Sequence, residues 1–302
     1  MNSRVHLVLR VVIDCAYLVR SRLPRGRKIG IFLEYLRLTL MVIFSVDSTR
    51  PGTTRVMRYT VRHFGIGSVQ FLFREIFVRN EYAFQASSER PVVFDCGANI
   101  GMATLFFKWL YPDCEIHAFE PDPETFGVLS ENVSRNKLRD VSLHNVALVA
   151  KAGRLDLFVP AGPSGSPLMS TLSGRGFESS VRRLSVDGKP LSAYVNTGEI
   201  DFLKMDVEGA EEPVLRELAS TGRLRKIKEM AIEYHHNVEG GFGDCGSFLQ
   251  LLYESGYKYQ LDATWGNPQS LGTFQDILIR ARRSAQVVTH RGTSVNPVEA
   301  AV

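Results

Sequence analysis

From residue 91 onward, the chain alternates short apolar runs with longer stretches whose apolar residues recur at helical spacing. The first two runs are Val92–Asp95 ("VVFD") and Glu115–Glu120 ("EIHAFE"), and a helical pattern follows each of them. Such alternation is typical of strands in a parallel sheet joined by crossover helices, so it predicts an α/β fold. Further strands are expected at 141–149, 153–160, 200–207, 228–236, 257–263 and 276–282. The clearest helices are expected at 102–110, from Pro121, at 212–218 and at 247–255.

A different pattern occupies the first 90 residues, where apolar side chains are mixed with many basic ones. We expect helices at 3–22 and 29–45, followed by a strand and a turn within 55–69. The segment 69–84 fits either an amphipathic helix or a pair of strands, and the pattern does not decide between them.

These patterns divide the chain into three parts. Residues 1–90 are predicted to form a basic, mostly helical extension that packs on the α/β domain, which covers residues 91–283. The tail, residues 284–302, is polar and lacks periodicity, which predicts disorder. The Ser- and Gly-rich connection at 161–176 is longer than most loops, so it is interpreted either as a lid over a pocket or as a flexible segment.

Charge is distributed unevenly along the 302 residues. The net charge is +4, but the segment from Met1 to Arg62 carries +9, which leaves −5 for the remainder. A mildly acidic α/β domain does not fit a nucleic-acid-binding protein. The four cysteines are far apart in the sequence, which predicts free thiols in a reducing compartment. We recognise no signal peptide and no membrane-spanning helix, and we therefore expect a cytoplasmic protein.

A glycine-containing turn follows the first strand of the α/β domain. Its sequence, "DCGANIG" at Asp95–Gly101, matches neither the G-x-G-x-x-G pattern of dinucleotide sites nor a Walker A loop. Asp95 at its start would repel a pyrophosphate and would suit a ligand with an ammonium or sulfonium group. The alternative role for Asp95 is a helix cap.

The second strand ends in an acidic residue at the expected separation from that turn. Glu120 lies 19 residues after Gly101, and in open parallel sheets an acidic residue there accepts both hydroxyls of a ribose. The alternative is a solvated charge at a strand end. Together, the turn and Glu120 favour an adenosine-containing ligand without distinguishing between nucleoside cofactors.

The motifs "VVFDCGANIG", "HAFEPDPETFGVLSENV", "LHNVAL" and "IDFLKMDVEGAEEPVL" resemble, in order and spacing, those of the FkbM-type family of S-adenosylmethionine-dependent O-methyltransferases. The resemblance implies a Rossmann-like, mostly parallel seven-stranded sheet of the class I methyltransferases, with the seventh strand antiparallel beside the fifth. It also implies that the turn surrounds the methionine part of S-adenosyl-L-methionine, that Glu120 holds the ribose and that the third strand lies near the adenine. The implied cofactor-binding residues are Asp95, Gly97, Ala98, Asn99, Gly101, Glu120, Pro121, Asn145, Ala147 and Asp206.

Methyl transfer to a hydroxyl requires positioning and a general base at the carboxyl ends of the strands. Asp206 and Glu208 close the fourth strand on one side, and His235 ends the fifth strand, so these three are the catalytic candidates. Glu233 shares a face with His235 and could orient it, whereas His236 points the other way. The alternative is a pair of surface histidines.

Neighbouring carboxylates leave two further questions open. Glu211 and Glu212 lie in the first turn of the following helix, where negative charge is favourable without any function. A divalent metal held by Asp206, Glu208 and His235 is chemically reasonable, but no ligand spacing demands it. We therefore assign no metal site.

Two further expectations concern the residues that bind the acceptor and the role of the N-terminal extension. Glu81 and Tyr82 precede the first strand of the α/β domain and, with Glu233 and His236, are weak candidates for acceptor binding. A basic amphipathic segment can lie on the inner face of a membrane, but packing on the α/β domain or in a homodimer is the preferred interpretation.

The predicted function is methyl transfer to a hydroxyl of a small molecule or glycan, namely a sugar, a lipid-linked sugar or a polyketide. One alternative is an inactive protein that only binds a nucleoside cofactor. An NAD-dependent dehydrogenase is disfavoured by the missing G-x-G-x-x-G pattern.

Overall fold

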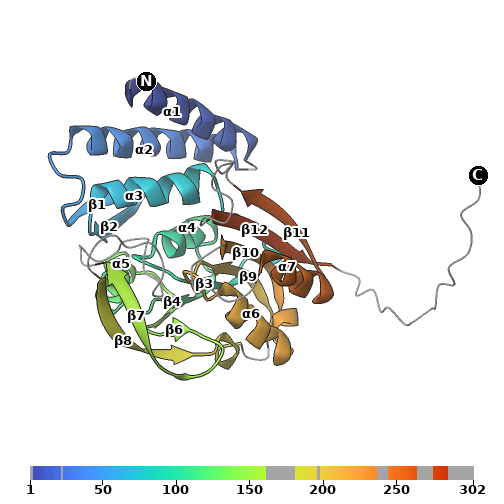
Figure 1. The fold of residues 1–302 in the computed structure, drawn as a ribbon. Coiled ribbons are helices and arrows are strands. Elements are labelled where there is room, and N and C mark those ends of the chain that lie inside the picture. The colour runs from blue at the N-terminus through green and yellow to red at the C-terminus, as the bar shows by residue number, and fades with distance from the viewer. Residues whose placement is uncertain are drawn as a thin grey trace, which may run out of the picture.

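The computed structural model describes residues 3–21, 23–160, 181–195, 198–236, 244–263 and 275–284. Its main element is a seven-stranded sheet in the order β11-β12-β10-β9-β3-β4-β5 (Figure 1). The strands are β3 (Val92–Cys96), β4 (Glu115–Phe119), β5 (Val141–His144), β9 (Ile200–Met205), β10 (Ile227–His236), β11 (Tyr257–Ala263) and β12 (Gln275–Arg283).

The sheet is parallel except at one strand. β3, β4, β5, β9 and β10 pair in parallel, whereas β12 lies between β10 and β11 and runs antiparallel to both. This confirms the predicted Rossmann-like sheet with its last strand inserted beside the fifth. Parallel strands all place their carboxyl ends at one edge, so the loops that follow them meet there.

Helices cover both faces of the sheet, and alternate strand residues pack against each layer. Val93 belongs to the core beneath α4 (Met102–Leu110) and the N-terminal region, whereas Phe94 belongs to the core beneath α6 (Glu211–Ser220) and α7 (Cys245–Glu254). This alternation follows from the two-residue period of a strand. The remaining crossover helix, α5, spans Pro123–Arg135. Asp122 caps its N-terminus, because the Asp122 carboxylate accepts from the Thr125 N–H.

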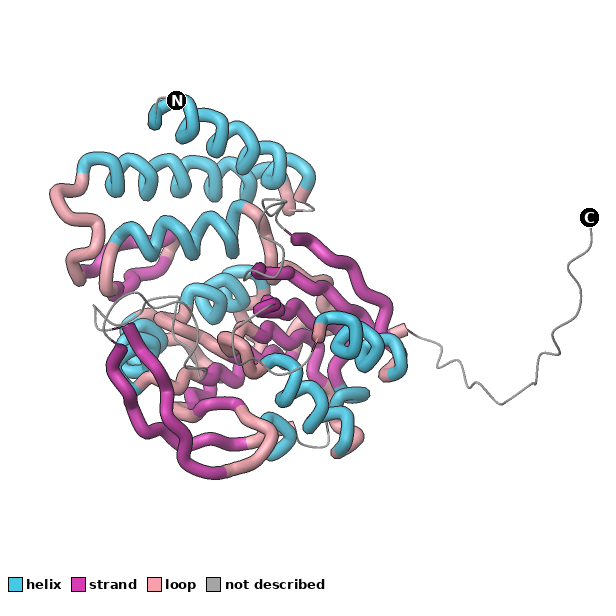
Figure 2. The backbone as a smooth tube through the Cα atoms, in the orientation of Figure 1, coloured by secondary structure: helices cyan, strands magenta, loops and turns pink. Residues whose placement is uncertain are grey.

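The N-terminal region forms a layer of three helices against one face of the sheet domain (Figures 1 and 2). Its elements are α1 (Ser3–Arg20), α2 (Arg25–Phe44), the hairpin β1 (Gly52–Val56) and β2 (Tyr59–His63), α3 (Ile66–Phe73) and the π-helix η1 (Arg74–Val78). The ambiguous segment 69–84 is therefore largely helical.

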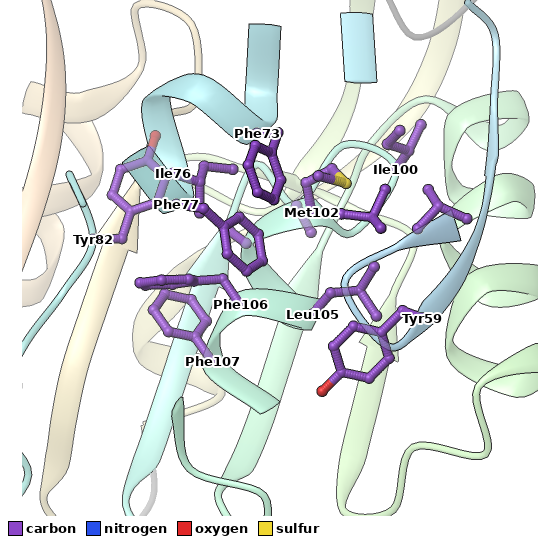
Figure 3. Packing of buried hydrophobic residues seen from close by; sticks show 14 of the residues in the cluster. Tyr59, Phe73, Ile76, Phe77, Tyr82, Ile100, Met102, Leu105, Phe106 and Phe107 are labelled. Atoms are coloured by element: carbon purple, nitrogen blue, oxygen red, sulfur yellow. The ribbon is translucent and has the colours of Figure 1, made fainter. Parts of the chain in front are cut away.

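Aromatic side chains join this layer to the sheet domain. Phe77 stacks on Phe73 with ring centroids 4.7 Å apart and meets Phe106 of α4 edge-on at 5.0 Å (Figure 3). These side chains belong to one buried cluster that runs from α2 to β3 and β4. Residues 1–90 therefore share a hydrophobic core with the α/β domain.

The predicted third strand, 141–149, is wrong in one respect because it splits into two strands of different sheets. β5 ends at His144, and the Asn145 side chain then donates to the carbonyl oxygens of Glu120 and Pro121, which turns the chain away. β6 (Ala147–Leu148) joins a second sheet of order β6-β8-β7, with β7 (Gly153–Pro160) and β8 (Val181–Lys189).

Sequence patterns missed β8 and also the short 3-10 helices η2 (Leu191–Ala193) and η3 (Leu224–Lys226). The predicted lid at 161–176 lies outside the described residues, as does the tail after residue 284. Among the described helices, none combines the length and the apolar character needed to span a membrane.

Candidate active site

A cavity of about 800 Å³ lies at the carboxyl ends of β3, β4, β9 and β10, beneath the N-terminal helices. Its volume lies within the range of small-molecule sites, roughly 300–1,000 Å³. Most of the predicted site residues line it: Glu81, Tyr82, Gly97, Ala98, Asn99, Glu120, Pro121, Ala147, Asp206, Glu208, Glu233 and His235. Asp95, Gly101, Asn145 and His236 are not part of its wall.

The glycine turn forms the floor of the cavity. The N–H groups of Gly97 and Ala98 both donate to the Phe119 carbonyl oxygen at the end of β4, at 3.0 and 2.8 Å. Gly97 has φ +80°, and a Cβ on it would lie 1.8 Å from the Asp206 carbonyl oxygen. Gly101, with φ +91°, precedes α4. Glycine at position 97 is therefore required both by the backbone conformation and by the close approach of β9.

Asp95 lies behind this turn and does not line the cavity. Its side chain is fully buried, with one carboxylate oxygen accepting from the Thr104 hydroxyl at 2.6 Å and the other 3.9 Å from the Lys204 ammonium. Burial raises the pKa of Asp95, and Lys204 opposes that rise. One oxygen therefore ties β3 to the start of α4, and the other lies near Lys204 without a hydrogen bond.

Glu120 is held where a ribose-binding carboxylate is expected. One of its oxygens accepts from the Asn99 N–H and the other from the Asp122 N–H, both at 2.9 Å. In the ionised form each oxygen keeps a further lone pair, so the carboxylate can then accept two hydroxyl groups. Burial raises the pKa of Glu120 to about 8. The neighbouring wall is apolar and includes Ala147 and Leu157 of the second sheet, which suits the flat face of a base.

At the other end of the cavity, carboxylates surround His235. Its Nδ1 lies 2.8 Å from a Glu211 carboxylate oxygen, and its Nε2 lies 3.2 Å from Glu208 and 3.9 Å from Asp206. The same Glu211 oxygen also accepts from the N–H groups of Val207 and Gly209. Because a carboxylate only accepts, Nδ1 donates to Glu211, and Nε2 lies among carboxylates that line the cavity.

The contact between Glu211 and His235 was not predicted, and the role of Glu233 beside His235 stays a prediction. Glu211 holds Nδ1, because it lies at the start of α6 opposite the end of β10, and its position in the first helical turn therefore has a second role. Glu233 lines the cavity and accepts from the Tyr82 hydroxyl at 3.4 Å. Burial and the nearby Asp206 raise the pKa of Glu233 to about 8. His236 packs beside the Tyr234 ring, away from the cavity.

Sequence reasoning also missed Lys204. This buried lysine of β9 donates to the Gly97 carbonyl oxygen at 2.5 Å and lies 3.4 Å from the Asp206 carboxylate. Desolvation alone would lower its pKa, but Asp206 and Asp95 together raise it. Lys204 therefore stays charged and balances the buried Asp95 and the partly exposed Asp206. A lysine inside an apolar strand was the available sequence signal.

The N-terminal layer supplies the remaining wall of the cavity. Of this region, only Glu81 and Tyr82 had been predicted as site residues. Tyr17 of α1, Phe71 of α3 and Arg79 after η1 line this side, together with Glu75 and with Arg280 of β12. Burial, and then the neighbouring Glu75, raises the pKa of Glu81 well above its ordinary value.

The carboxylates near His235 could also hold a cation. Ligand atoms of Asp206, Glu208 and His235 lie within 4.8 Å of one another, as do those of Glu233, His235 and Asp276. Oxygen ligands with one imidazole suit a divalent metal, and Glu211 on Nδ1 is the outer contact such a histidine usually makes. No metal site was predicted from the sequence, and these two clusters show only that suitable ligand types lie close together.

The strand order, the glycine turn after β3 and the acidic residue after β4 together define a class I methyltransferase. The family model described as "Methyltransferase FkbM domain" matches residues 95–259, which is more than half of the chain. The protein therefore belongs to the FkbM methyltransferase family, as the motifs indicated.

Three curated relatives illustrate the similarity. The 31-O-demethyl-FK506 methyltransferase FkbM of Streptomyces tacrolimicus is 31% identical over 225 residues, covering 63% of this chain and 84% of the relative. The hexuronic acid methyltransferase AglP of Haloferax volcanii is 28% identical, covering 63% and 76%. The 2-O-methyltransferase NoeI of Sinorhizobium fredii is 31% identical, covering 48% and 63%.

Proposed function

We propose that this methyltransferase moves the methyl group of S-adenosyl-L-methionine to a hydroxyl of a sugar or a secondary metabolite. The observation that carries the proposal is that Glu120 and His235 line one cavity. A buried carboxylate for a ribose at one end and an oriented imidazole at the other match the two halves of an O-methylation. We further propose a cytoplasmic location, since the four cysteines are free.

Different residues would bind the cofactor and the acceptor hydroxyl. The Gly97–Asn99 turn and Asp206 would hold the amino acid end of the cofactor, with Lys204 fixing Asp206 from below. When bound, the cofactor supplies an activated methyl group on a positively charged sulfur. His235 Nε2 then accepts the acceptor's hydroxyl proton as the carbon–oxygen bond forms and the sulfur–carbon bond breaks, leaving a neutral thioether.

Nearby carboxylates would stabilise the protonated His235. Glu211 fixes the imidazole through Nδ1, and Asp206 and Glu208 face the nitrogen that gains the proton. In a site that is largely shielded from water, such fixed charges favour the state in which the imidazole is positive. Glu211 is thus proposed as a positioning residue, and His235 as the base.

The part of the cavity beneath the N-terminal helices would receive the acceptor. It carries Glu75, Arg79, Glu81 and Arg280, which offer donors and acceptors to a hydroxyl-rich molecule, and Tyr17 as an aromatic platform. AglP and NoeI are named as a hexuronic acid methyltransferase and a 2-O-methyltransferase, which supports an oxygen acceptor on a sugar. Glu233 and Tyr82 would border it.

Calorimetry tests the cofactor. We expect binding of S-adenosylmethionine and S-adenosylhomocysteine, at least about tenfold weaker in Glu120→Ala because a buried pair of hydrogen bonds to the ribose is lost. Exposed Glu89→Ala is the control. Tight binding of NAD with no response to the sulfur nucleosides would overturn the proposal.

Methyl transfer from labelled cofactor to a panel of sugars and polyketides tests the base. His235→Asn should lower kcat by about 10²–10⁴-fold with unchanged cofactor affinity. Glu211→Gln should lower kcat less and shift its pH profile, because Gln can still contact the imidazole but cannot stabilise its positive form. Full turnover in His235→Asn would remove the base assignment, and absence of any transfer by the native chain would favour a protein that only binds the cofactor.

A chelator decides the metal question in the same assay. Loss of turnover with EDTA that Mg²⁺ restores would show that the reaction depends on a metal, with the two clusters around His235 as the candidate sites. Unchanged turnover would leave these carboxylates as partners of the imidazole alone.

A further inference from the structure

Helix α2 carries two apolar faces, and only one of them is buried in the structure. Ile31, Tyr35 and Leu38 are buried against the rest of the N-terminal layer and the core. Another set repeats at helical spacing and is solvent-exposed by 40–80%: Ile29, Leu33, Leu36, Leu40, Ile43 and Phe44. We call this second set the docking face. Figures 1 and 2 show α2 between α1 and α3, a position that leaves a side of the helix uncovered.

This face is unusual in both size and regularity. From Ile29 to Ile43 its members are separated by three or four residues, and Phe44 lies four residues after Leu40, so they form one stripe roughly 22 Å long. Scattered exposed apolar residues need no explanation, but a continuous stripe on a monomer marks an interaction surface. No charged residue stands on that stripe after Arg25; the nearest, Arg37, is paired with Glu34 at 2.6 Å.

Positive charge gathers at one end of the docking face. Between Ala16 and Leu33 the sequence holds five basic residues and no acidic one. Arg20 ends α1, Arg25 begins α2 in line with the stripe, and the Lys28 ammonium bonds the Val19 carbonyl oxygen at 2.7 Å, which joins the two helix ends into one corner. We call Arg20, Arg25 and Lys28 the basic corner; Arg27 instead lies over the Trp109 ring of α4, 4.8 Å from its centroid.

We propose that the docking face and the basic corner seat the protein on an anionic lipid surface, with α2 lying in the interface plane. An apolar helix face that enters the headgroup boundary, next to clustered Arg and Lys that meet lipid phosphates, is the combination such binding requires. A second copy of this chain suits the surface less well, because the carboxylates of α1, α2 and the turn after α2 already have partners. Asp14 is buried, Glu34 pairs with Arg37, and Asp47 is held by Thr49.

Membrane binding goes beyond the proposed function and does not rest on it. It would also fix how the cavity is oriented relative to the lipid surface. Tyr17 and Phe71 line the cavity and are themselves 42% and 47% exposed, so the cavity reaches the surface through the same helical layer that carries the docking face. A membrane-seated protein would therefore receive an acceptor that is attached to, or dissolved near, the lipid surface.

Vesicle co-sedimentation of the full-length protein tests the proposal. With vesicles of phosphatidylcholine containing roughly 30% phosphatidylglycerol, we expect binding that falls steeply in about 0.5 M salt. Leu33→Glu/Leu40→Glu should lower binding by at least about tenfold, because charges do not enter the apolar layer. Arg20→Gln/Arg25→Gln should lower it by about fivefold per charge removed on anionic vesicles only.

Matched controls separate membrane binding from misfolding and from self-association. Tyr253→Glu/Tyr259→Glu changes two exposed residues of α7 and β11 and should leave vesicle binding unaltered. Circular dichroism and cofactor calorimetry should be the same for all variants. Equal vesicle binding by the native chain and Leu33→Glu/Leu40→Glu would overturn the proposal. So would light scattering that shows a dimer, dissociated by Leu33→Glu/Leu40→Glu, together with no vesicle binding.

Discussion

At the scale of single residues, the site depends on a few backbone positions that tolerate only one side chain. Gly97 is the strictest of them, since the end of β9 passes where its side chain would be. The turn then presents Ala98 and Asn99 to the cavity, and the Asn99 N–H fixes Glu120. One glycine therefore controls both the floor of the cavity and the orientation of the carboxylate proposed to bind the ribose.

Gly97→Ala is expected to abolish cofactor binding and to destabilise the fold. The added Cβ would lie 1.8 Å from the Asp206 carbonyl oxygen, so β9 or the turn has to move, and φ +80° is strained for alanine as well. Calorimetry and urea unfolding measure both effects. Gly127→Ala is the control, because its helix leaves open space there and alanine favours helices; native cofactor affinity in Gly97→Ala would contradict the expected close approach.

Residue patterns alone could predict some of this site and not the rest. Glu120 and the glycine turn follow from a fixed spacing between neighbouring strands, which the parallel topology imposes. Glu211 and Lys204 could not be assigned, because their roles depend on which atoms of α6, β9 and β10 meet in space. The charge of Glu211 was compatible with a simple helix terminus, and only its contact with His235 shows otherwise.

At the scale of elements, the N-terminal layer is tied to its own core by a buried group of charges. The Asp14 carboxylate of α1 accepts from the Tyr35 hydroxyl at 2.6 Å and from Arg74 at 2.7 Å, and it lies 3.7 Å from Arg79. Asp14 thus links α1, α2 and η1. Arg79 also lines the cavity, so the same link sets the shape of the proposed acceptor side.

Asp14→Ala is expected to lower the free energy of unfolding by about 1–3 kcal/mol, because the buried Tyr35 hydroxyl loses its acceptor and Arg74 keeps only Glu75. Urea unfolding measures the loss. Asp187→Ala is the control, since its pair with Arg154 is exposed and contributes little. Equal effects of the two substitutions would show that the Asp14 group does not hold the layer in place.

At the scale of the whole molecule, stability is expected to depend on pH through buried carboxyl groups. The folded protein keeps a proton on Glu120 up to about pH 8, whereas the unfolded chain loses it near its ordinary pKa of 4.5. Between these values the folded state binds more protons, so this stabilising contribution is complete below the unfolded pKa and is lost as pH rises toward 8.

Glu120→Gln should therefore flatten the decline of the free energy of unfolding between roughly pH 4.5 and 8, because glutamine has no proton to lose. Chemical unfolding of the cofactor-free protein at several pH values measures the slope. Glu89→Gln, at an exposed position, should keep the native slope. A native slope in Glu120→Gln would show that the Glu120 carboxylate is ionised in the folded state at neutral pH.

The sequence by itself determined the α/β class, the positions of most strands along the chain, and the positions of the turn and of Glu120. These follow from the hydrophobic period and from motifs within single strand–helix units. Only the tertiary structure decided that 141–149 divides between two sheets, that Glu211 contacts His235 Nδ1, and that α2 keeps a second apolar face exposed. Each of these depends on contacts between segments far apart in the chain, and a side chain's partner across such a distance is set by packing, which local periodicity does not encode.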